Sequence, residues 1–295
     1  MTPAVNGIVL LNKPQGWTSR KAVNVVRRLF SRVKAGHTGT LDPLATGMLP
    51  IMLGKATRFA SIGLDADKAY EVEIDLSLQT DTLDLEGEKL ESFSDMPEQE
   101  AVYAAVKTFL GQSEQIPPQF SAIRVDGKRA HAMARAGESF ELAARSVILH
   151  QVDVLSYQAP VLSLYVRCSK GTYIRSLARD IGLALAVGGC VQRLHRCSTA
   201  GWHVDQMVSI EQLEETPAAH VLSTSQWLHD FPSIQLNAEL ARRFLHGQRL
   251  VMPEIVHDIY QVMYAGSLLG TAEWKEGVLH PQHVLATQQE IFDDA

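Results

Sequence analysis

Hydrophobic and polar residues alternate most regularly between residues 70 and 78. Apolar side chains occupy every second position there, and Glu71, Glu73 and Asp75 stand between them. Successive side chains of a β-strand point to opposite faces, so this pattern predicts a strand with one buried and one solvated face. Short apolar runs at residues 7–11 and 161–168 predict two further strands.

Apolar residues spaced three or four apart predict amphipathic helices between these strands. The first helix begins at an N-cap of Thr18 or Ser19 and presents basic residues opposite its apolar stripe. Another follows residue 173 and ends at the pair Gly188 and Gly189. The expected helices cover residues 18–33, 97–110, 174–187, 208–213, 218–228 and 237–245.

The chain changes character near residues 230–233. Beyond that point, short apolar runs are separated by Gly266, Gly270 and Gly277, which is typical of a small β-rich module. We therefore expect an α+β protein with a large domain over residues 1–230 and a small domain over residues 231–295.

The charges of the chain are segregated, although its formal net charge of −6 argues against general adhesion to nucleic acid. Asp42 is the first acid, and seven basic residues precede it. A second basic island runs from Arg167 to Arg196. Either these residues form one positive face on an acidic body, or they are ordinary solvated helix faces.

Cysteine usage and the N-terminal sequence favour a cytoplasmic protein. Cys168, Cys190 and Cys197 form no C-x-x-C pair, which suits a reducing compartment. The first residues do not resemble a signal peptide, and no segment is long enough to span a bilayer. The spacing of Cys190, His195 and Cys197 fits no common zinc pattern, so buried thiols are favoured over a metal site.

Residues 36–47, with the sequence GHTGTLDPLATG, are the most unusual stretch. They hold three glycines, three threonines, one histidine and a single acid, Asp42. Glycine permits positive φ angles and close approach to a ligand, and Pro43 restricts the backbone of Asp42. The Asp42 carboxylate is therefore either a turn former that accepts backbone N–H bonds or a positioned nucleophile.

Several sequence blocks, in this order, resemble the bacterial tRNA pseudouridine-55 synthases of the TruB type. They are GIVLLNKPQGWTS at 7–19, GHTGTLDPLATGMLP at 36–50, DKAY at 67–70 with TDTLDLEG at 80–87, SKGTYIR at 169–175 and LHR at 194–196. The resemblance covers about the first two hundred residues. It implies a pseudouridine-synthase-type fold, in which a mixed, largely antiparallel sheet is flanked by helices. It also implies an RNA-gripping insertion over about residues 112–145 and, more weakly, a PUA-like C-terminal module.

The resemblance implies that uridine 55 in the T-loop of tRNA is isomerised to pseudouridine. Uracil must then be extruded, detached from C1′, turned and rejoined through C5. Asp42 matches the nucleophile of the family, and Arg175 matches the arginine expected to form a bidentate pair with it. The resemblance implies tRNA as the partner and no metal, cofactor or protein partner, so we expect a monomer.

Other positions match residues of the family that bind substrate. Tyr70 matches a tyrosine that stacks on the target base and is a candidate proton acceptor, and His37 a histidine that contacts the extruded nucleotide. Tyr173 and Leu194 match residues that shape the uracil pocket, and Lys13 a lysine that supports the loop or a phosphate. The basic residues that would hold the RNA backbone are Arg20, Lys21, Arg27, Arg28, Arg32 and Arg196.

The chain departs from the family pattern in and after the Ile-Pro-Pro block, where Phe120, Arg124 and His131 replace the common residues. Two other classes of function stay open. One is a different enzyme with an aspartate nucleophile, although phosphoryl transfer would require further acids near Asp42 for Mg²⁺. The other is a non-catalytic protein of the same fold that binds or folds tRNA, which would need the basic face but not Asp42.

Overall fold

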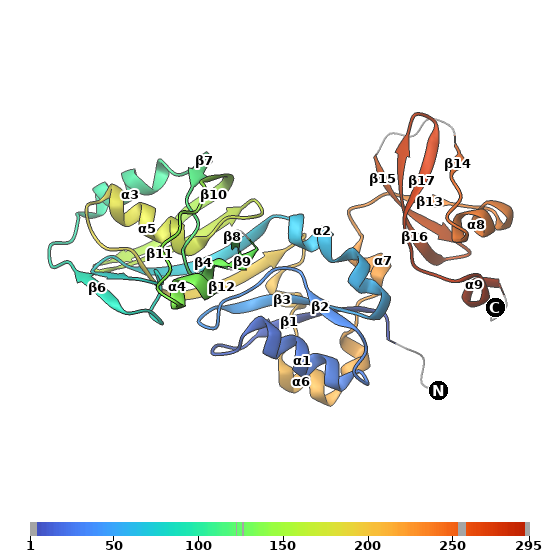
Figure 1. Ribbon diagram of the computed structural model, residues 1–295, viewed down its shortest axis with the longest axis horizontal. Helices are drawn as coiled ribbons and strands as arrows, with labels where there is room; N and C mark the ends of the chain where they lie inside the picture. Colours follow the sequence, from blue (N-terminus) through green and yellow to red (C-terminus); the bar gives the residue numbers. More distant parts are fainter. Residues whose placement is uncertain (1–4, 122, 126, 253–257, 293–295) are drawn as a thin grey trace.

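A mixed eight-stranded sheet forms the centre of the molecule in the computed structural model, which describes residues 5–121, 123–125, 127–252 and 258–292 (Figure 1). The strand order is β1-β3-β12-β4-β11-β10-β7, and β2 pairs with β3. Every pairing is antiparallel except that of β12 with β3. The strands are β1 Gly7–Lys13, β2 Ala35–His37, β3 Thr46–Leu53, β4 Lys68–Asp75, β7 Gly111–Gln115, β10 Arg145–Gln158, β11 Val161–Cys168 and β12 Cys190–Thr199. The expected α+β fold with a largely antiparallel sheet is confirmed.

Strand β1 is buried on both faces. Val9 and Leu11 belong to the main core, whereas Ile8 and Leu10 pack into a second core on the opposite face of the sheet. This explains why its sequence is a continuous apolar run rather than an alternating one.

Strand β4 follows the predicted alternation but ends earlier than expected. Tyr70, Val72 and Ile74 are buried, and Glu71 between them is exposed. At Ser77 the chain leaves the large sheet, because its N–H and hydroxyl both donate to the Asp75 carboxylate. A small hairpin of β5 Leu78–Thr80 and β6 Lys89–Ser92 follows.

Helix α1, Ser19–Leu29, packs on β2 and β3 and is capped by the Thr18 hydroxyl, which accepts from the Lys21 N–H. The prediction that it continues to residue 33 is wrong. Ser31 and Arg32 adopt positive φ angles of 53° and 58°, and the Arg32 N–H donates to the Arg27 carbonyl. Such a left-handed termination usually requires glycine, so the sequence contained no stop signal.

The remaining helices lie around the large sheet and differ from the predicted ones mainly in length. In Figure 1, α3 and α5 lie on the part of the sheet that contains β10 and β11. Two short helices replace the single one expected over residues 218–228. The elements are η1 Gly54–Phe59, α2 Ala60–Asp65, α3 Gln99–Lys107, α5 Ile174–Ala184, η2 Val204–Gln206, α6 Ile210–Glu215, η3 Pro217–His220 and α7 Thr224–Trp227.

The range 112–145, expected to hold an RNA-gripping insertion, begins within β7 and reaches the first residue of β10. Residues 112–115 belong to β7 of the large sheet. The rest contains a small hairpin, β8 Arg124–Val125 with β9 Lys128–Arg129, and the helix α4 Ala130–Arg135.

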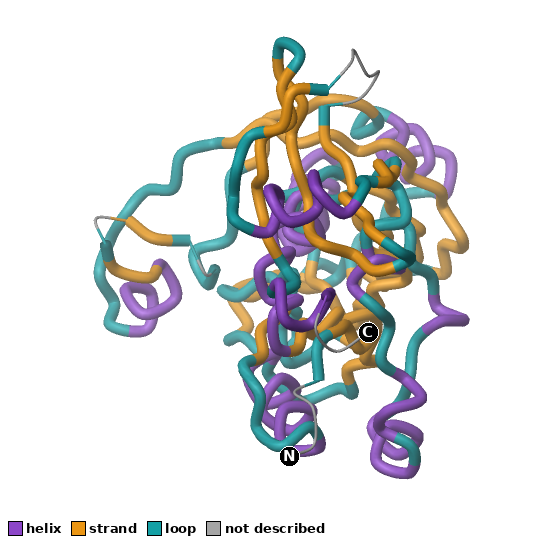
Figure 2. Tube along the Cα trace, turned by 90° about the vertical axis from the view of Figure 1, so that its right-hand side faces the viewer, coloured by secondary structure: helices purple, strands orange, loops and turns teal. Residues whose placement is uncertain are grey.

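The C-terminal part has a sheet and a core of its own, as expected for a β-rich module. Its strand order is β13-β15-β16-β17-β14, and Phe244, Val262 and Leu279 are buried within it. Figure 1 shows this module beside the main sheet, and Figure 2 views the molecule from the side of the module. The elements are β13 Ser233–Gln235, α8 Ala238–Leu245, β14 Leu250–Val251, β15 Ile259–Tyr264, β16 Ser267–Lys275, β17 Val278–Val284 and α9 Gln288–Phe292. The predicted outer domain limits, residues 1 and 295, lie outside the described residues.

Candidate active site

The loop around Asp42 is attached to two neighbouring elements through its backbone. The Ser19 hydroxyl at the start of α1 accepts from the Leu41 N–H at 2.8 Å and donates to the Leu41 carbonyl at 2.9 Å. The Gly16 N–H, which follows β1, donates to the Pro43 carbonyl at 2.8 Å. These bonds flank Asp42 on both sides and therefore fix where its carboxylate lies.

Two buried cations, Lys13 and Arg196, lie beneath the same loop and bond its backbone carbonyls. The Lys13 ammonium donates to the carbonyls of Pro14, Trp17 and Pro43 and is fully buried, so it supports the loop and is not free to bind substrate. Burial lowers its pKa to about 8. Arg196 is 1% exposed and donates from Nε to the Met48 carbonyl and from Nη2 to the Gly39 carbonyl. The prediction that Arg196 grips the RNA backbone is therefore wrong.

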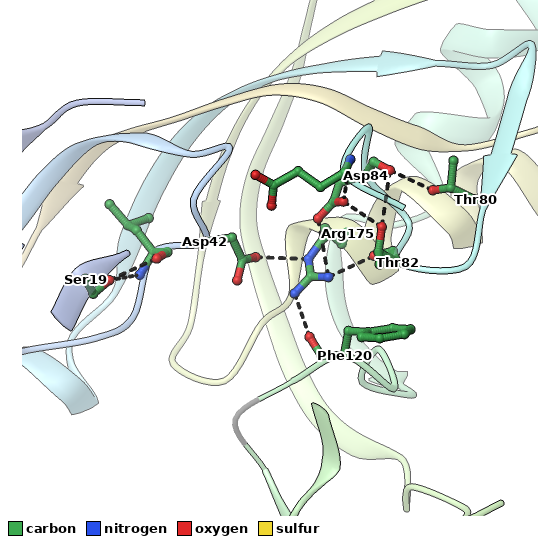
Figure 3. Close-up of polar contacts among 9 residues, drawn as sticks. Ser19, Asp42, Thr80, Thr82, Asp84, Phe120 and Arg175 are labelled. Atoms are coloured by element: carbon green, nitrogen blue, oxygen red, sulfur yellow. Dashed lines mark hydrogen bonds and ion pairs between the residues drawn. The ribbon is translucent and has the colours of Figure 1, made fainter. Parts of the chain in front are cut away.

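Arg175, on α5, forms an ion pair with Asp42, but the pair is not bidentate as expected (Figure 3). Nε lies 3.0 Å from one Asp42 oxygen. The other nitrogens are engaged elsewhere: Nη1 donates to the Thr82 carbonyl at 2.8 Å and Nη2 to the Phe120 carbonyl at 2.9 Å. With its side chain 6% exposed, the guanidinium is fixed from three directions.

Asp84 is a second carboxylate on Arg175 and was missed in the sequence, where residues 80–87 look like a polar loop. Its Oδ2 lies 3.4 Å from Nη1 of Arg175, and the residue is 3% exposed. Oδ1 accepts from the Thr82 hydroxyl at 2.6 Å and from the Glu86 N–H at 3.1 Å. The available signal was the Thr-x-Thr-x-Asp cluster, because short polar side chains at this spacing can bond one another within a loop.

Asp42 is partly exposed, and its surroundings shift the pKa of its carboxyl group. Its side chain is 37% exposed, so a ligand can reach the carboxylate from solvent. Burial of the residue raises the pKa of Asp42, the charge of Arg175 lowers it, and the charge of Asp84 raises it. A carboxylate held by one arginine contact, with a further oxygen free of that contact, can act as a base or as a nucleophile.

Tyr70 is within electrostatic range of this carboxylate and lies on β4, and Leu194 lies on the neighbouring strand β12. Tyr70 is opposite Arg196 in the strand register, and both Tyr70 and Leu194 are nearly buried. Burial raises the pKa of Tyr70, and the positive charge and hydrogen bond of Arg196 oppose that shift. Arg196 therefore connects the tyrosine to the Asp42 loop.

His37 and Tyr173 complete the set of predicted site residues. Nδ1 of His37 accepts from the Gly39 N–H at 3.3 Å, and burial together with Arg196 lowers the pKa of His37, which favours the neutral ring. Tyr173 precedes α5, and its N–H donates to the Gln115 side chain at 2.8 Å. Burial raises the pKa of Tyr173, and the charge of Asp42 contributes to the same shift. Its ring is thus within electrostatic range of the candidate nucleophile.

The predicted RNA-binding cations on and after α1 are all exposed. They are Arg20, Lys21, Arg27, Arg28 and Arg32. Among the described residues, none of these five forms an ion pair with an acid. Because Ser19 at the start of α1 holds the Asp42 loop, this basic surface is directly connected to the candidate site.

The described part of the chain contains neither a cluster of metal ligands nor a membrane-spanning helix. No group of three or more histidine, cysteine, aspartate or glutamate side chains there is arranged to hold a metal ion. No helix within the same residues has the length and apolar character needed to cross a membrane.

Solved structures share this fold. A chain of a Cbf5–Nop10–Gar1 complex superimposes with a TM-score of 0.75 over 96% of this chain and 86% of that chain, at 22% sequence identity. A chain of an archaeal box H/ACA Nop10–Cbf5 complex matches over the same shares with a TM-score of 0.70 and 23% identity. These likenesses show that this chain has the fold of those two chains, which here places the Asp42–Arg175 pair beside the buried Tyr70.

Sequence comparisons assign the family. The family model described as "TruB family pseudouridylate synthase (N terminal domain)" matches residues 27–174, and two TruB C-terminal models match residues 175–231 and 232–285. A protein of Ralstonia pickettii named tRNA pseudouridine synthase B is 42% identical, covering 95% of this chain and 94% of its own length. One of Azoarcus sp. with the same name is 39% identical, covering 96% of each. The chain belongs to the TruB family of pseudouridylate synthases, and the predicted resemblance is confirmed.

Proposed function

We propose that this protein isomerises uridine 55 in the T-loop of tRNA to pseudouridine. The observation that carries the proposal is the accessible Asp42 carboxylate, which a buried arginine holds at 3.0 Å within a rigid loop. The similarity to relatives named tRNA pseudouridine synthase B supports tRNA as the substrate.

In the proposed reaction, Asp42 acts at the ribose of the extruded uridine. The C1′–N1 bond breaks, uracil turns within the pocket, and a C1′–C5 bond forms. Two routes are compatible with this outcome: attack of Asp42 on C1′ to form an ester, or removal of the C2′ proton. Either route requires ionised Asp42, and Arg175 opposes the effect of burial on its pKa.

We assign the neighbouring side chains to binding the detached base. Tyr70 would stack on uracil and relay the proton that leaves C5, while N1 gains a proton overall. Leu194 and Tyr173 would shape the pocket. Neutral His37 would contact the extruded nucleotide. RNA loops are favourable targets because their bases are already partly unstacked and can pack on aromatic rings.

The exposed basic residues of α1 would hold the backbone of the T stem-loop. Phosphate contacts of this kind orient an RNA without reading its sequence. We further propose that residues 1–230 form the catalytic domain, that residues 231–295 form a PUA-like domain, and that the protein acts as a monomer in the cytoplasm.

The test is site-specific. An unmodified tRNA transcript labelled with tritium at C5 of uridine should release one tritium per molecule, and a transcript with cytidine at position 55 should release none. Release from both transcripts would refute the assignment of position 55. Binding of both without release from either would favour a non-catalytic tRNA-binding protein.

A further inference from the structure

Most cations in the second basic island are already neutralised. Acid partners lie within 2.8 to 3.5 Å of Arg167, Lys170, Arg179 and Arg193. These partners are Asp67, Asp65, Asp180 and Glu73, respectively. Such pairs have little charge left to offer an RNA phosphate.

Arg145, which lies near Tyr173 of the proposed uracil pocket, has no such acid partner in the described part of the chain. No carboxylate of the described residues is within ion-pair distance of its guanidinium. Its Nε is buried and has no hydrogen-bond partner among those residues. Among the described residues, no acceptor therefore competes with a phosphate for this N–H group.

A rigid frame holds the Arg145 side chain next to the proposed uracil pocket. Arg145 is the first residue of β10 and is paired with Gln115 of β7, whose side chain accepts from the Tyr173 N–H. The guanidinium carbon lies 5.7 Å from the centroid of the Tyr173 ring. A Cβ atom on Gly171 would lie 3.7 Å from Nη1, which places the guanidinium against the turn that leads into α5. The Arg145 guanidinium is thus within cation–π distance of the ring that shapes the proposed pocket.

We propose that Arg145 binds a backbone phosphate next to the extruded uridine, with Tyr173 as the platform that orients its guanidinium. The proposal rests on the proposed function. A nucleotide whose ribose reaches Asp42 brings its two flanking phosphates to the same region, and Tyr173 is within electrostatic range of Asp42 and Arg145 alike. A planar guanidinium held over an aromatic ring by a cation–π contact is well suited to a phosphate, because the contact leaves its N–H groups available.

The first experiment measures the salt dependence of binding. Each phosphate that a cation neutralises adds about 0.7 to 0.9 to the slope of log affinity against log salt. Arg145→Gln should lower affinity for the tRNA transcript by about 10- to 100-fold at low salt and reduce that slope by about one unit. Arg145→Lys should retain the slope, because it retains the charge. Lys107→Gln, which removes an exposed cation at the end of α3, should leave both quantities unchanged.

An unchanged slope for Arg145→Gln would overturn the proposal: with weaker binding it would indicate that Arg145 only supports Tyr173, and with normal binding that it has no role.

A second experiment identifies the phosphate. Transcripts carrying a neutral methylphosphonate on one side or the other of uridine 55 should bind wild-type protein about tenfold more weakly at one of these positions. The same replacement should not weaken binding to Arg145→Gln any further. Equal losses for both proteins at each position would overturn the proposal. Failure of wild-type protein to release tritium would instead refute the proposed function, so the two failures are distinguishable.

Discussion

Replacing Asp84 by asparagine tests whether the second carboxylate on Arg175 matters. The substitution keeps the shape of the side chain and the acceptor that bonds Thr82, but it removes the charge 3.4 Å from Nη1 of Arg175. One charge-assisted contact contributes about 1.5–3 kcal/mol, and Nη1 keeps its bond to the Thr82 carbonyl. We therefore expect a loss of about 2 kcal/mol in unfolding free energy, which corresponds to roughly 4–8 °C in Tm for a domain of this size.

The same substitution should change catalysis in two separate ways. Without Asp84 the guanidinium is held less firmly, and a misplacement of about 1 Å can cost on the order of 100-fold in rate. We expect kcat to fall by about 10- to 100-fold. The charge of Asp84 also raises the pKa of Asp42, so its removal lowers that pKa. Because the reaction needs ionised Asp42, the acid limb of the pH–rate profile should move to lower pH.

The assay is single-turnover tritium release across a pH series, with thermal unfolding measured in parallel. Glu88→Gln is the matched control, since it removes an exposed acid directly after the same loop. It should keep the wild-type kcat. Wild-type kcat and an unchanged acid limb in Asp84→Asn would refute the idea that this carboxylate positions Arg175.

Other substitutions test the supports of the Asp42 loop. Ser19→Ala leaves two backbone groups of Leu41 without partners and should lower unfolding free energy by about 2–3 kcal/mol, measured by chemical denaturation. Arg196→Lys cannot reach both carbonyls that arginine bonds, so kcat should fall about 10- to 100-fold while tRNA affinity changes less than about twofold, since the residue is buried. A matching loss of affinity would argue for RNA contact. The pKa of Lys13 is about 8 in the folded protein and 10.5 in the unfolded chain. Between these pH values the unfolded chain binds more protons at Lys13, so the free energy of unfolding should rise with pH in this range. Lys13→Met should reduce that rise by up to about 3 kcal/mol, and an identical rise in both proteins would contradict the buried charge.

Local patterns predicted the regular elements well. The alternation around Tyr70 identified β4, and the spacing of apolar residues identified α5 and α1. The end of α1 could not be read, because Ser31 and Arg32 adopt a conformation that glycine usually occupies. Whether Ser31 and Arg32 adopt this conformation depends on tertiary packing and not on local propensity.

The chemistry of individual cations was harder to predict. Arginine is rarely buried without a partner, so Arg196 was expected on the surface. Its partners are backbone carbonyls of residues far away in the sequence, and they meet it only when β3 and β12 pair. Asp84 was missed for the same reason, because its role depends on the approach of α5. Motif recognition located Asp42, but only the folded chain brings its supports together.

The central claim is that the Asp42 carboxylate performs the reaction. The direct test compares wild-type protein with Asp42→Asn in two assays, binding of a tRNA transcript and release of C5 tritium from it. The variant should bind the transcript within about threefold of wild type, since Arg175 and the exposed cations of α1 remain. Only wild-type protein should release tritium. Tritium release by Asp42→Asn at a rate near that of wild type would contradict the assignment of the nucleophile.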